Sequence, residues 1–596
     1  MGRDSHTLLY LLRDDPLQSK PLGARMDKEF HVRRMAVQSR KTGVKLTLAM
    51  VLLCLAVRFI TPFAQSMSTS MDEEAVRTAK MESLREEETV YTSVLEMIPV
   101  EQTWDIEDTH ALAEKPLIRS MRSIKGELGC DNESRTFYLP MQTNLSEWPQ
   151  IELEASGEDE LTVAWADDYA YDFPGQAVSD NQRYRLIAWT AGEYEYVDLV
   201  FTGLPMVMLH TGGAEEIEEE YVPVRTQVFA PGYETVSSMA QIHRRGGGFR
   251  REEKLSLRLE FAEKNRKGRY VKGRQALLGM PEDSDWLLIS NESDETLMRN
   301  AMGWQLWKKM NPDGDAFSLL ESRMVEVCLD DRYMGVYALQ QRIRPQTELQ
   351  MRGFESQQDV SARIILSYGI DKRPVQKTTG FMGGVLELRY KPDWMTEEDA
   401  FARYDELMKL SANSQSSLWL QDDQFVSVAE EHTEIQELMR YFLFFQAAGL
   451  GDDNVKNNLY IWAVKRGEKT IYLLSPWDMD QGFNSHGTDQ IINYNLNWPI
   501  RLLNLNALGS REALWDEWNA NKESVFSEDA IYDWTMSLES EMNASGAWRR
   551  ECERWAGRPD ALDLTEDREF ILAHLAELER SMREIWPLPG MLETGV

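Results

Sequence analysis

The chain has 596 residues, 42% of them hydrophobic, so it is long enough for two or three domains and apolar enough for a sizeable core. Its formal net charge of −34 argues against nucleic acid as a partner, because phosphate backbones are bound by basic surfaces. The eight histidines form no H-x-x-x-H pair, and no G-x-S-x-G segment is present, which excludes the common zinc-protease and serine-hydrolase motifs. The cysteines are widely spaced, and we expect free thiols rather than a zinc site or a disulfide framework at Cys54, Cys130, Cys328 and Cys552.

The amino-terminal residues predict export. A basic leader, predicted to be cytoplasmic, covers 1–45, and the segment 46–64 is apolar apart from Arg58. Its length approaches the ~20 residues that a membrane-spanning helix needs. Two interpretations remain open: an uncleaved transmembrane signal-anchor, which makes a single-pass protein of the cell membrane, or a signal peptide, which makes a secreted protein. Both place the remaining chain outside the cytoplasm, whereas a buried core helix is the structural alternative.

Two regions follow without any chemical motif. Residues 65–129 are charged and helix-prone, which predicts a linker. Over 130–215, short alternating runs such as TFYLPM, LTVAWADD and RYRLIAWTA are separated by turn residues. This pattern predicts a small antiparallel β domain, sandwich-like in organisation. A surface adhesin, one alternative function for the chain, would depend on this domain.

A glycine-rich turn between two strands is the first segment with possible chemistry. Strands are predicted over 237–244 and 254–261, with Arg245 and Gly246 between them. In kinases, a glycine loop covers the phosphates of ATP and a strand lysine pairs with them. Lys254 occupies such a position, although a plain hairpin with a glycine turn explains the same pattern.

The next predicted elements contain two further candidate nucleotide contacts. A strand and a helix are predicted over 285–310, the helix opening near Asp294 as its N-cap. Arg299 in this helix either links helix to sheet or contacts the nucleotide. A hairpin is predicted over 324–343 and a strand over 381–392, where Glu387 faces either the nucleotide or solvent.

The segment 451–484 has the most distinctive pattern. A buried helix over 433–451 leads to Asp452 and Asp453, and a hairpin leads from Asn458 to Pro476-Trp477-Asp478-Met479-Asp480. Asp453 and Asn458 have the five-residue spacing of a kinase catalytic loop, in which the Asp orients the acceptor hydroxyl and the Asn binds metal. Carboxylate and amide oxygens at strand ends suit Mg²⁺.

The chain after 484 is predicted to be mainly helical. Tryptophans recur there at helical spacings and are expected in the core, at positions 515, 518, 534, 548 and 555. Glu551, close to the last of them, is expected on a solvated helix face together with Glu541 and Glu553.

Taken together, these segments resemble the CotH family of spore-coat kinases, atypical members of the protein-kinase-like fold. The similarity is carried by KNNLYIW (456–462), SPWDMDQGF (475–483), MVEVCLDDRYMGVYALQQRI (324–343) and the Asp-x-x-x-x-Arg-Asn of 294–300. The resemblance implies an α+β chain with a two-lobed, kinase-like catalytic domain over 223–560 and a helical tail over 561–596. The transmembrane helix and the small β domain precede this catalytic domain.

The resemblance also implies a function. It predicts an enzyme that transfers the γ-phosphate of ATP, with Mg²⁺ or Mn²⁺, to Ser/Thr hydroxyls of envelope or spore-coat proteins. The amino-terminal segment adds the prediction that this enzyme is exported and held at the membrane by its amino-terminal helix, or secreted if that segment is cleaved. Asp453 is the expected catalytic residue, with Asp452 as the alternative. The expected metal ligands are Asn458, Asp478 and Asp480, and the expected nucleotide contacts are Lys254, Arg245, Gly246, Arg299 and Glu387. The alternatives are a kinase-fold enzyme that transfers AMP or another group, and a non-catalytic coat or surface-assembly protein.

Overall fold

The computed structural model describes residues 75–84, 92–93, 98–141, 150–166, 174–214, 216–246, 254–312, 320–343, 358–365, 375–377, 385–451, 455, 458–483, 491–589 and 591. Contacts divide the chain into the units Met1–Glu74 and Ala75–Val596, and every described residue lies in the second. The predicted leader (1–45) and apolar segment (46–64) lie outside the described residues. Within the described ranges, no helix combines the length and the apolar character needed to cross a membrane.

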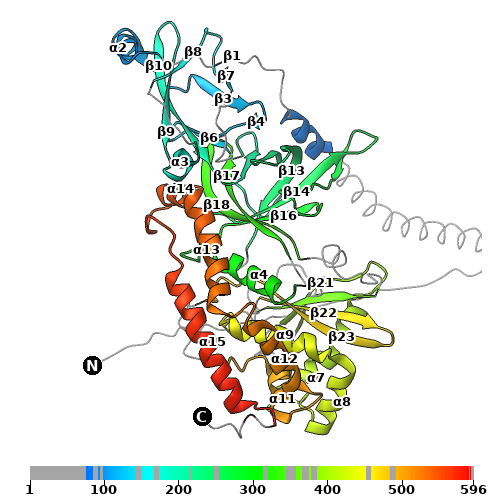
Figure 1. The fold of residues 1–596 in the computed structure, drawn as a ribbon. Coiled ribbons are helices and arrows are strands. Elements are labelled where there is room, and N and C mark those ends of the chain that lie inside the picture. The colour runs from blue at the N-terminus through cyan, green and yellow to red at the C-terminus, as the bar shows by residue number, and fades with distance from the viewer. Residues whose placement is uncertain are drawn as a thin grey trace, which may run out of the picture. The chain divides into compact units, whose positions relative to one another are not determined.

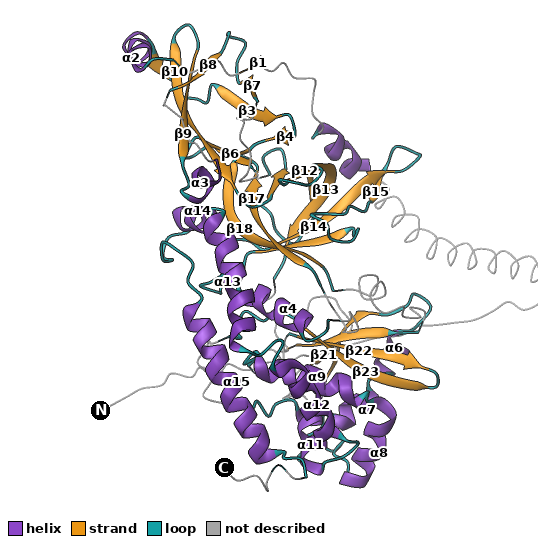
Figure 2. Ribbon diagram, in the orientation of Figure 1, coloured by secondary structure: helices purple, strands orange, loops and turns teal. Residues whose placement is uncertain are grey.

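The described chain is mixed α+β and contains four sheets (Figures 1 and 2). Two of them form the amino-terminal part, with strand orders β1-β7-β3-β4 and β5-β6-β10-β9-β8, and β2 pairs with β10. Their elements are β1 (Thr92–Ser93), α2 (Val100–Thr109), β2 (Ala111–Leu112), β3 (Ile118–Ser123), β4 (Gly126–Glu127), β5 (Gly129–Asp131), β6 (Thr136–Pro140), β7 (Ile151–Ala155), β8 (Thr162–Trp165), α3 (Pro174–Ser179), β9 (Arg183–Trp189) and β10 (Glu193–Thr202). The strands predicted from the alternating runs in this region are confirmed as β6 to β10.

The third sheet closes into a barrel, because β13 pairs both with β12 and with β14. The ring runs β13-β12-β11-β17-β18-β16-β14, and β15 extends it beside β14. Its strands are β11 (Met206–His210), β12 (Val222–Phe229), β13 (Val236–Arg244), β14 (Leu257–Lys264), β15 (Tyr270–Lys272), β16 (Asp285–Ile289), β17 (Ser322–Leu329) and β18 (Arg332–Gln341). A β-bulge at Val327/Cys328 interrupts the β17–β18 register, and bulges of this kind help a sheet to curve.

The barrel is packed inside and on two outer faces. Every second side chain of β14 points inward, and Leu257, Leu259 and Phe261 belong to the interior cluster. On one outer face, Met206 and Tyr333 pack against the amino-terminal sheets. On another, strands β16 to β18 join the largest cluster of buried residues, which also fills the helical part of the chain.

The helical lobe, by which we mean residues 358–589 together with α4, contains the fourth sheet, of order β20-β21-β19-β22-β23. Its strands are β19 (Val360–Ile365), β20 (Val375–Lys377), β21 (Val385–Tyr390), β22 (Leu459–Arg466) and β23 (Lys469–Pro476). Its helices are α4 (Arg299–Lys309), α6 (Glu397–Ala402), α7 (Asp405–Leu410), α8 (Asp422–His432), α9 (Ile435–Ala447), α11 (Asn497–Leu505), α12 (Ser510–Lys522), α13 (Glu528–Ala544), α14 (Ala547–Arg554) and α15 (Thr565–Ile585).

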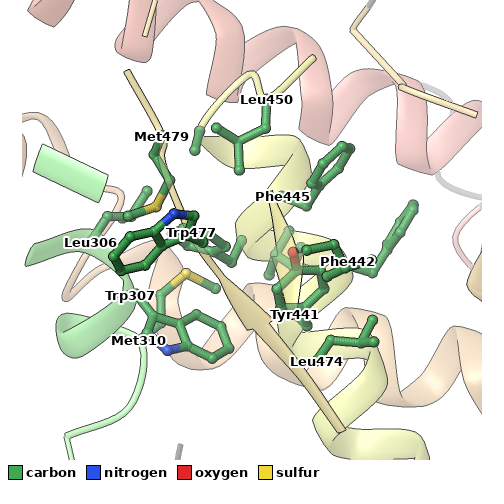
Figure 3. Packing of buried hydrophobic residues seen from close by; sticks show 14 of the residues in the cluster. Leu306, Trp307, Met310, Tyr441, Phe442, Phe445, Leu450, Leu474, Trp477 and Met479 are labelled. Carbon is green, nitrogen blue, oxygen red and sulfur yellow. The ribbon is translucent and has the colours of Figure 1, made fainter. Parts of the chain in front are cut away.

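Aromatic side chains form the centre of this lobe (Figure 3). Trp307 of α4 packs edge-on against Tyr441 and Phe444 of α9, with ring centroids 5.9 and 4.9 Å apart. The prediction that the carboxyl-terminal tryptophans serve the core is confirmed, since Trp515, Trp518, Trp534 and Trp548 are buried and Trp555 packs against the barrel interior. The described cysteines, Cys130, Cys328 and Cys552, are free thiols, as expected.

One predicted boundary is wrong. Helix α4 begins at Arg299 rather than near Asp294. Asn291 and Leu297 adopt left-handed backbone angles, φ 49° and 60°, so the chain turns through this segment before the helix starts. The Asp294 carboxylate still accepts a hydrogen bond from the Arg299 backbone N–H at 2.8 Å.

Candidate functional site

Asn458 and Asp478 meet at the open end of the β22–β23 hairpin. The register pairs Leu459 with Pro476, so the residue that enters β22 lies beside the residues that leave β23. The Asn458 side-chain N–H donates to the backbone carbonyl of Asp478 at 3.4 Å. Asp478 itself has φ 52°, a left-handed conformation that Asp tolerates better than most residues. The sequence prediction that these two positions converge is therefore realised in space.

The segment after Trp477 is held by α4 and by the loop that precedes it. The Met479 backbone N–H donates to the Asn300 side-chain oxygen at 2.7 Å. Asn300 in turn donates to the side-chain oxygen of Asn291 at 3.0 Å. The Ser293 hydroxyl donates to the Asp480 carboxylate at 2.7 Å. These bonds fix the backbone that carries the two carboxylates.

Arg299 joins α4 to α15. Its guanidinium lies 3.1 Å from the Asp294 carboxylate and 2.9 Å from that of Asp567, and all three side chains are buried. Burial raises the pKa of Asp294 and of Asp567, and the nearby Arg299 opposes that rise. These contacts account for Arg299 as a link between elements, and its contact with a nucleotide stays a prediction.

Lys254 lies at the edge of the barrel in a buried ion pair. Its ammonium donates to Glu551 of α14 at 2.6 Å, and the two side chains are 1% and 0% exposed. The ammonium also lies 5.0 Å from the centre of the Tyr337 ring. Burial lowers the pKa of Lys254, and Glu551 opposes this effect. Among the described residues, these contacts are with α14 and the barrel, and none is with Asp478 or Asp480.

Glu551 corrects the sequence analysis, which expected it on a solvated face. The residue is fully buried, and its second carboxylate oxygen accepts from the Val336 backbone N–H at 2.7 Å. No local pattern in the helix distinguishes it from its exposed neighbour Glu553, because its partner Lys254 is 297 residues away in the chain. The pairing follows from the burial of Lys254 in the structure, since a buried ammonium needs a carboxylate.

Arg245 and Gly246 directly follow strand β13 and lie beside the Pro-Trp-Asp segment. The Arg245 guanidinium lies 5.3 Å from the centre of the Trp477 ring, within the range of a cation–π contact. Burial lowers the pKa of Arg245, while the Asp478 carboxylate raises it. Gly246 is exposed and has φ 111°, a conformation that a side chain would strain.

Glu387 lies on β21 and does not face solvent. It is 3% exposed, and its carboxylate accepts from Arg389 at 2.8 Å and lies 3.7 Å from Arg363. The Arg389 guanidinium also lies 5.8 Å from the centre of the Tyr460 ring, which packs edge-on against Trp477 at 6.0 Å. Glu387 is thus connected to the surroundings of Asp478 through arginine and aromatic side chains.

The oxygen donors near the hairpin suit a magnesium ion. In the ranges that the structure describes, no group of three or more His, Cys, Asp or Glu side chains could hold a metal by itself. Mg²⁺, however, is commonly held by one or two carboxylates together with waters and substrate phosphates. Asp478, with Asn458 and Asp480 beside it, fits that kind of donor set. Asp452 and Asp453 lie outside the described residues.

Comparison with protein families identifies a match. The family model described as CotH kinase protein matches residues 242–563, more than half of the chain. The matched region begins within β13 and contains Lys254, the hairpin of Asn458 and Asp478, and α14. No curated protein matches the chain.

Proposed function

Because the chain belongs to the CotH kinase family, we propose that it is a protein kinase that transfers the γ-phosphoryl group of ATP to Ser or Thr hydroxyls. The observation that best supports this proposal is the convergence of Asn458 and Asp478 at the end of one hairpin. There, the Asn458 side chain donates a hydrogen bond of 3.4 Å to the backbone carbonyl of Asp478. In protein kinases, a catalytic-loop Asn and an Asp on a following strand end hold the metal ions that bridge the phosphates. The proposal includes a two-lobed, kinase-like arrangement of the barrel and the helical lobe.

The mechanism assigns each reacting group to a residue. Asp453, or Asp452 in its place, accepts the proton of the substrate hydroxyl as its oxygen attacks the γ-phosphorus. The bond between the γ-phosphorus and the β–γ bridging oxygen breaks, and ADP leaves with that oxygen. Asp478 and Asn458 would hold Mg²⁺ or Mn²⁺, and the bound ion would neutralise phosphate charge. Asp480, whose carboxylate accepts a hydrogen bond from the Ser293 hydroxyl, would assist these two metal ligands.

The proposed setting is the cell envelope. The basic leader and the apolar segment 46–64 favour export, with the catalytic region outside the cytoplasm and either anchored at the membrane or secreted. The substrates proposed on this basis are envelope or coat proteins. Their identity is a separate question from the reaction type.

The test is a label-transfer assay with the full chain. The protein is incubated with γ-labelled ATP, Mg²⁺ or Mn²⁺, and dephosphorylated casein as a general Ser/Thr acceptor. Asp478→Ala is expected to abolish transfer, because metal-dependent charge neutralisation is lost. Asp516→Ala, which changes an exposed carboxylate on α12, is the matched control and is expected to retain transfer.

A parallel reaction with α-labelled ATP separates the alternatives. Incorporation of the γ label alone supports phosphoryl transfer. Incorporation of the α label would instead establish transfer of AMP. If neither label is incorporated and calorimetry detects no nucleotide binding, the enzyme proposal is wrong and a structural surface protein remains.

A further inference from the structure

One face of the five-stranded sheet carries a polar row beside Trp477. In the register, Arg363 of β19 lies opposite Glu387 on one side and Tyr460 on the other. Tyr460 lies opposite Ser475 of β23. The adjacent row, which points to the other face, consists of apolar residues of the main core, Ala362, Leu388, Ile461 and Leu474.

The row continues into the barrel through aromatic rings. Arg389, two residues after Glu387, lies over the Tyr460 ring at 5.8 Å. The Tyr460 and Trp477 rings pack together with centroids 6.0 Å apart. Arg245, which follows β13 of the barrel, lies over the Trp477 ring, 5.3 Å from its centroid. We call Arg245, Arg363 and Arg389 the cationic row. Arg363 and Arg389 come from β19 and β21, and Arg245 directly follows β13, yet all three contact this one set of side chains.

Among the described residues, the three guanidinium groups of the cationic row have two carboxylates near them, Asp478 beside Arg245 and Glu387 beside the other two. Arg363 and Arg389 share the single carboxylate of Glu387, at 3.7 and 2.8 Å. Their side chains are only 24% and 16% exposed. In the part of the chain that the structure describes, Nε of Arg363 is buried and has no hydrogen-bond acceptor. Partly buried guanidinium groups that lack acceptors are costly, and this excess stands out in a chain of net charge −34.

We propose that the cationic row binds the polyphosphate group of a nucleoside triphosphate, and that Arg363 and Arg389 are its main contacts. Planar guanidinium groups form bidentate hydrogen bonds with phosphate oxygens, and the Arg363 and Arg389 side chains keep 24% and 16% of their surface exposed for such contacts. Asp478 follows Trp477 directly, so the proposed metal ligand adjoins the proposed phosphate contacts. This inference rests on the proposed kinase function and adds residues that the sequence analysis did not single out.

The experiment measures two ligands by calorimetry on the full chain: ATP with Mg²⁺, and inorganic tripolyphosphate, which has no base or sugar. Arg363→Gln and Arg389→Gln are each expected to weaken both ligands about 10- to 100-fold, the usual effect of losing a charge-assisted hydrogen bond. The matched control is Arg466→Gln at the exposed end of β22, 3.7 Å from Glu434, which is expected to leave both affinities unchanged. Unfolding curves verify that each variant is folded.

The outcomes separate this inference from the proposed function. Arginine-dependent binding of tripolyphosphate without any label transfer would support the cationic row and contradict the kinase. Label transfer with an unchanged KM for ATP in a folded Arg363→Gln variant would support the kinase and overturn the cationic row. If the parent chain binds neither ATP with Mg²⁺ nor tripolyphosphate in the calorimeter, the proposed role of the cationic row is also overturned. If Arg363→Gln does not fold, Arg389→Gln and the milder Arg363→Lys decide between these outcomes.

Discussion

The ammonium of Lys254 and the carboxylate of Glu551 form a solvent-excluded hydrogen bond of 2.6 Å between residues 297 positions apart. Glu551 also accepts from the backbone of Val336 at 2.7 Å, so one carboxylate fastens α14 to the barrel at two points. Beside it on α14, Arg550 makes a second buried pair with Glu326 of β17, with bonds of 2.7 and 2.8 Å. Two buried ion pairs therefore attach helix α14 to the barrel.

Replacing Lys254 by Met is expected to destabilise the chain by about 3–5 kcal/mol, because Glu551 would remain charged and unpaired in the interior. Urea unfolding followed by tryptophan fluorescence measures this change. The double variant Lys254→Met/Glu551→Gln is expected to recover part of the loss, since the unpaired charge is removed. Unchanged stability together with weaker ATP binding would instead support the predicted role of Lys254 as a nucleotide contact.

Gly335→Ala tests the contact between α14 and β18 directly. A Cβ at Gly335 would lie 2.1 Å from a Glu551 carboxylate oxygen, and the residue has φ 86°. Gly467, in the β22–β23 turn, has φ 62° but open space around the Cβ position. Gly467→Ala is therefore expected to cost about 1–2 kcal/mol from backbone strain alone. Gly335→Ala is expected to cost at least about 2 kcal/mol more, from the displaced carboxylate, and equal losses would contradict this account.

Local patterns predicted much of the fold. The strong alternation on either side of Gly467 located β22 and β23 within a residue or two, and the apolar run before Gly451 located α9. These elements are determined by short-range periodicity and turn residues. The start of α4 was placed wrongly, because helix propensity around Asp294 gave no sign of the left-handed turn at Leu297.

The site was less accessible to sequence reasoning. The pairing of Asn458 with Asp478 was predictable because a single hairpin connects them. The burial of Glu551 was not predictable, because it depends on Lys254, 297 residues earlier in the sequence. The same holds for Arg363 and Arg389, whose significance depends on the register of three strands and on Trp477. Contacts set by tertiary packing leave no short-range signal.

Acidification is expected to destabilise the helical lobe through His574. The residue is 3% exposed, and its Nε2 donates to the Gln446 carbonyl at 2.7 Å, since a carbonyl can only accept. Burial lowers the pKa of His574 in the folded chain, whereas in the unfolded chain the pKa has its ordinary value of about 6.5. Between these two pKa values, His574 is protonated in the unfolded chain and neutral in the folded one. Stability then falls with decreasing pH below about 6.5, by up to about 1.4 kcal/mol per pH unit.

The measurement is the free energy of unfolding from urea titrations at pH 7.5, 6.5 and 5.5. His574→Gln retains a neutral side-chain donor, and it is expected to lose less stability between pH 6.5 and 5.5 than the parent chain. Other titrating groups act in both proteins and cancel in the comparison. Identical pH dependence in the two would show that His574 does not contribute.

The region matched by the family model is expected not to fold alone. A fragment of residues 242–563 lacks β11, β12 and most of β13, although β11 lies between β12 and β17 in the barrel. It therefore opens the ring and removes interior residues such as Val207 and Leu209. It also lacks α15, whose Leu578 and Met582 are fully buried in the main core.

Calorimetry of three fragments tests this expectation. Residues 75–596, which contain the complete barrel and α15, are expected to give a cooperative unfolding transition. Residues 242–563 are expected to aggregate or to unfold without one, because an open barrel exposes unpaired strand edges and an uncovered apolar interior. Adding residues 203–241 and 564–589 to the shorter fragment is expected to restore cooperativity in part, since the amino-terminal sheets that cover Met206 and Tyr333 would still be missing. A cooperative transition in 242–563 itself would mean that the ring can close between β14 and β17 without β11, and that α15 is an addition to the lobe rather than part of its core.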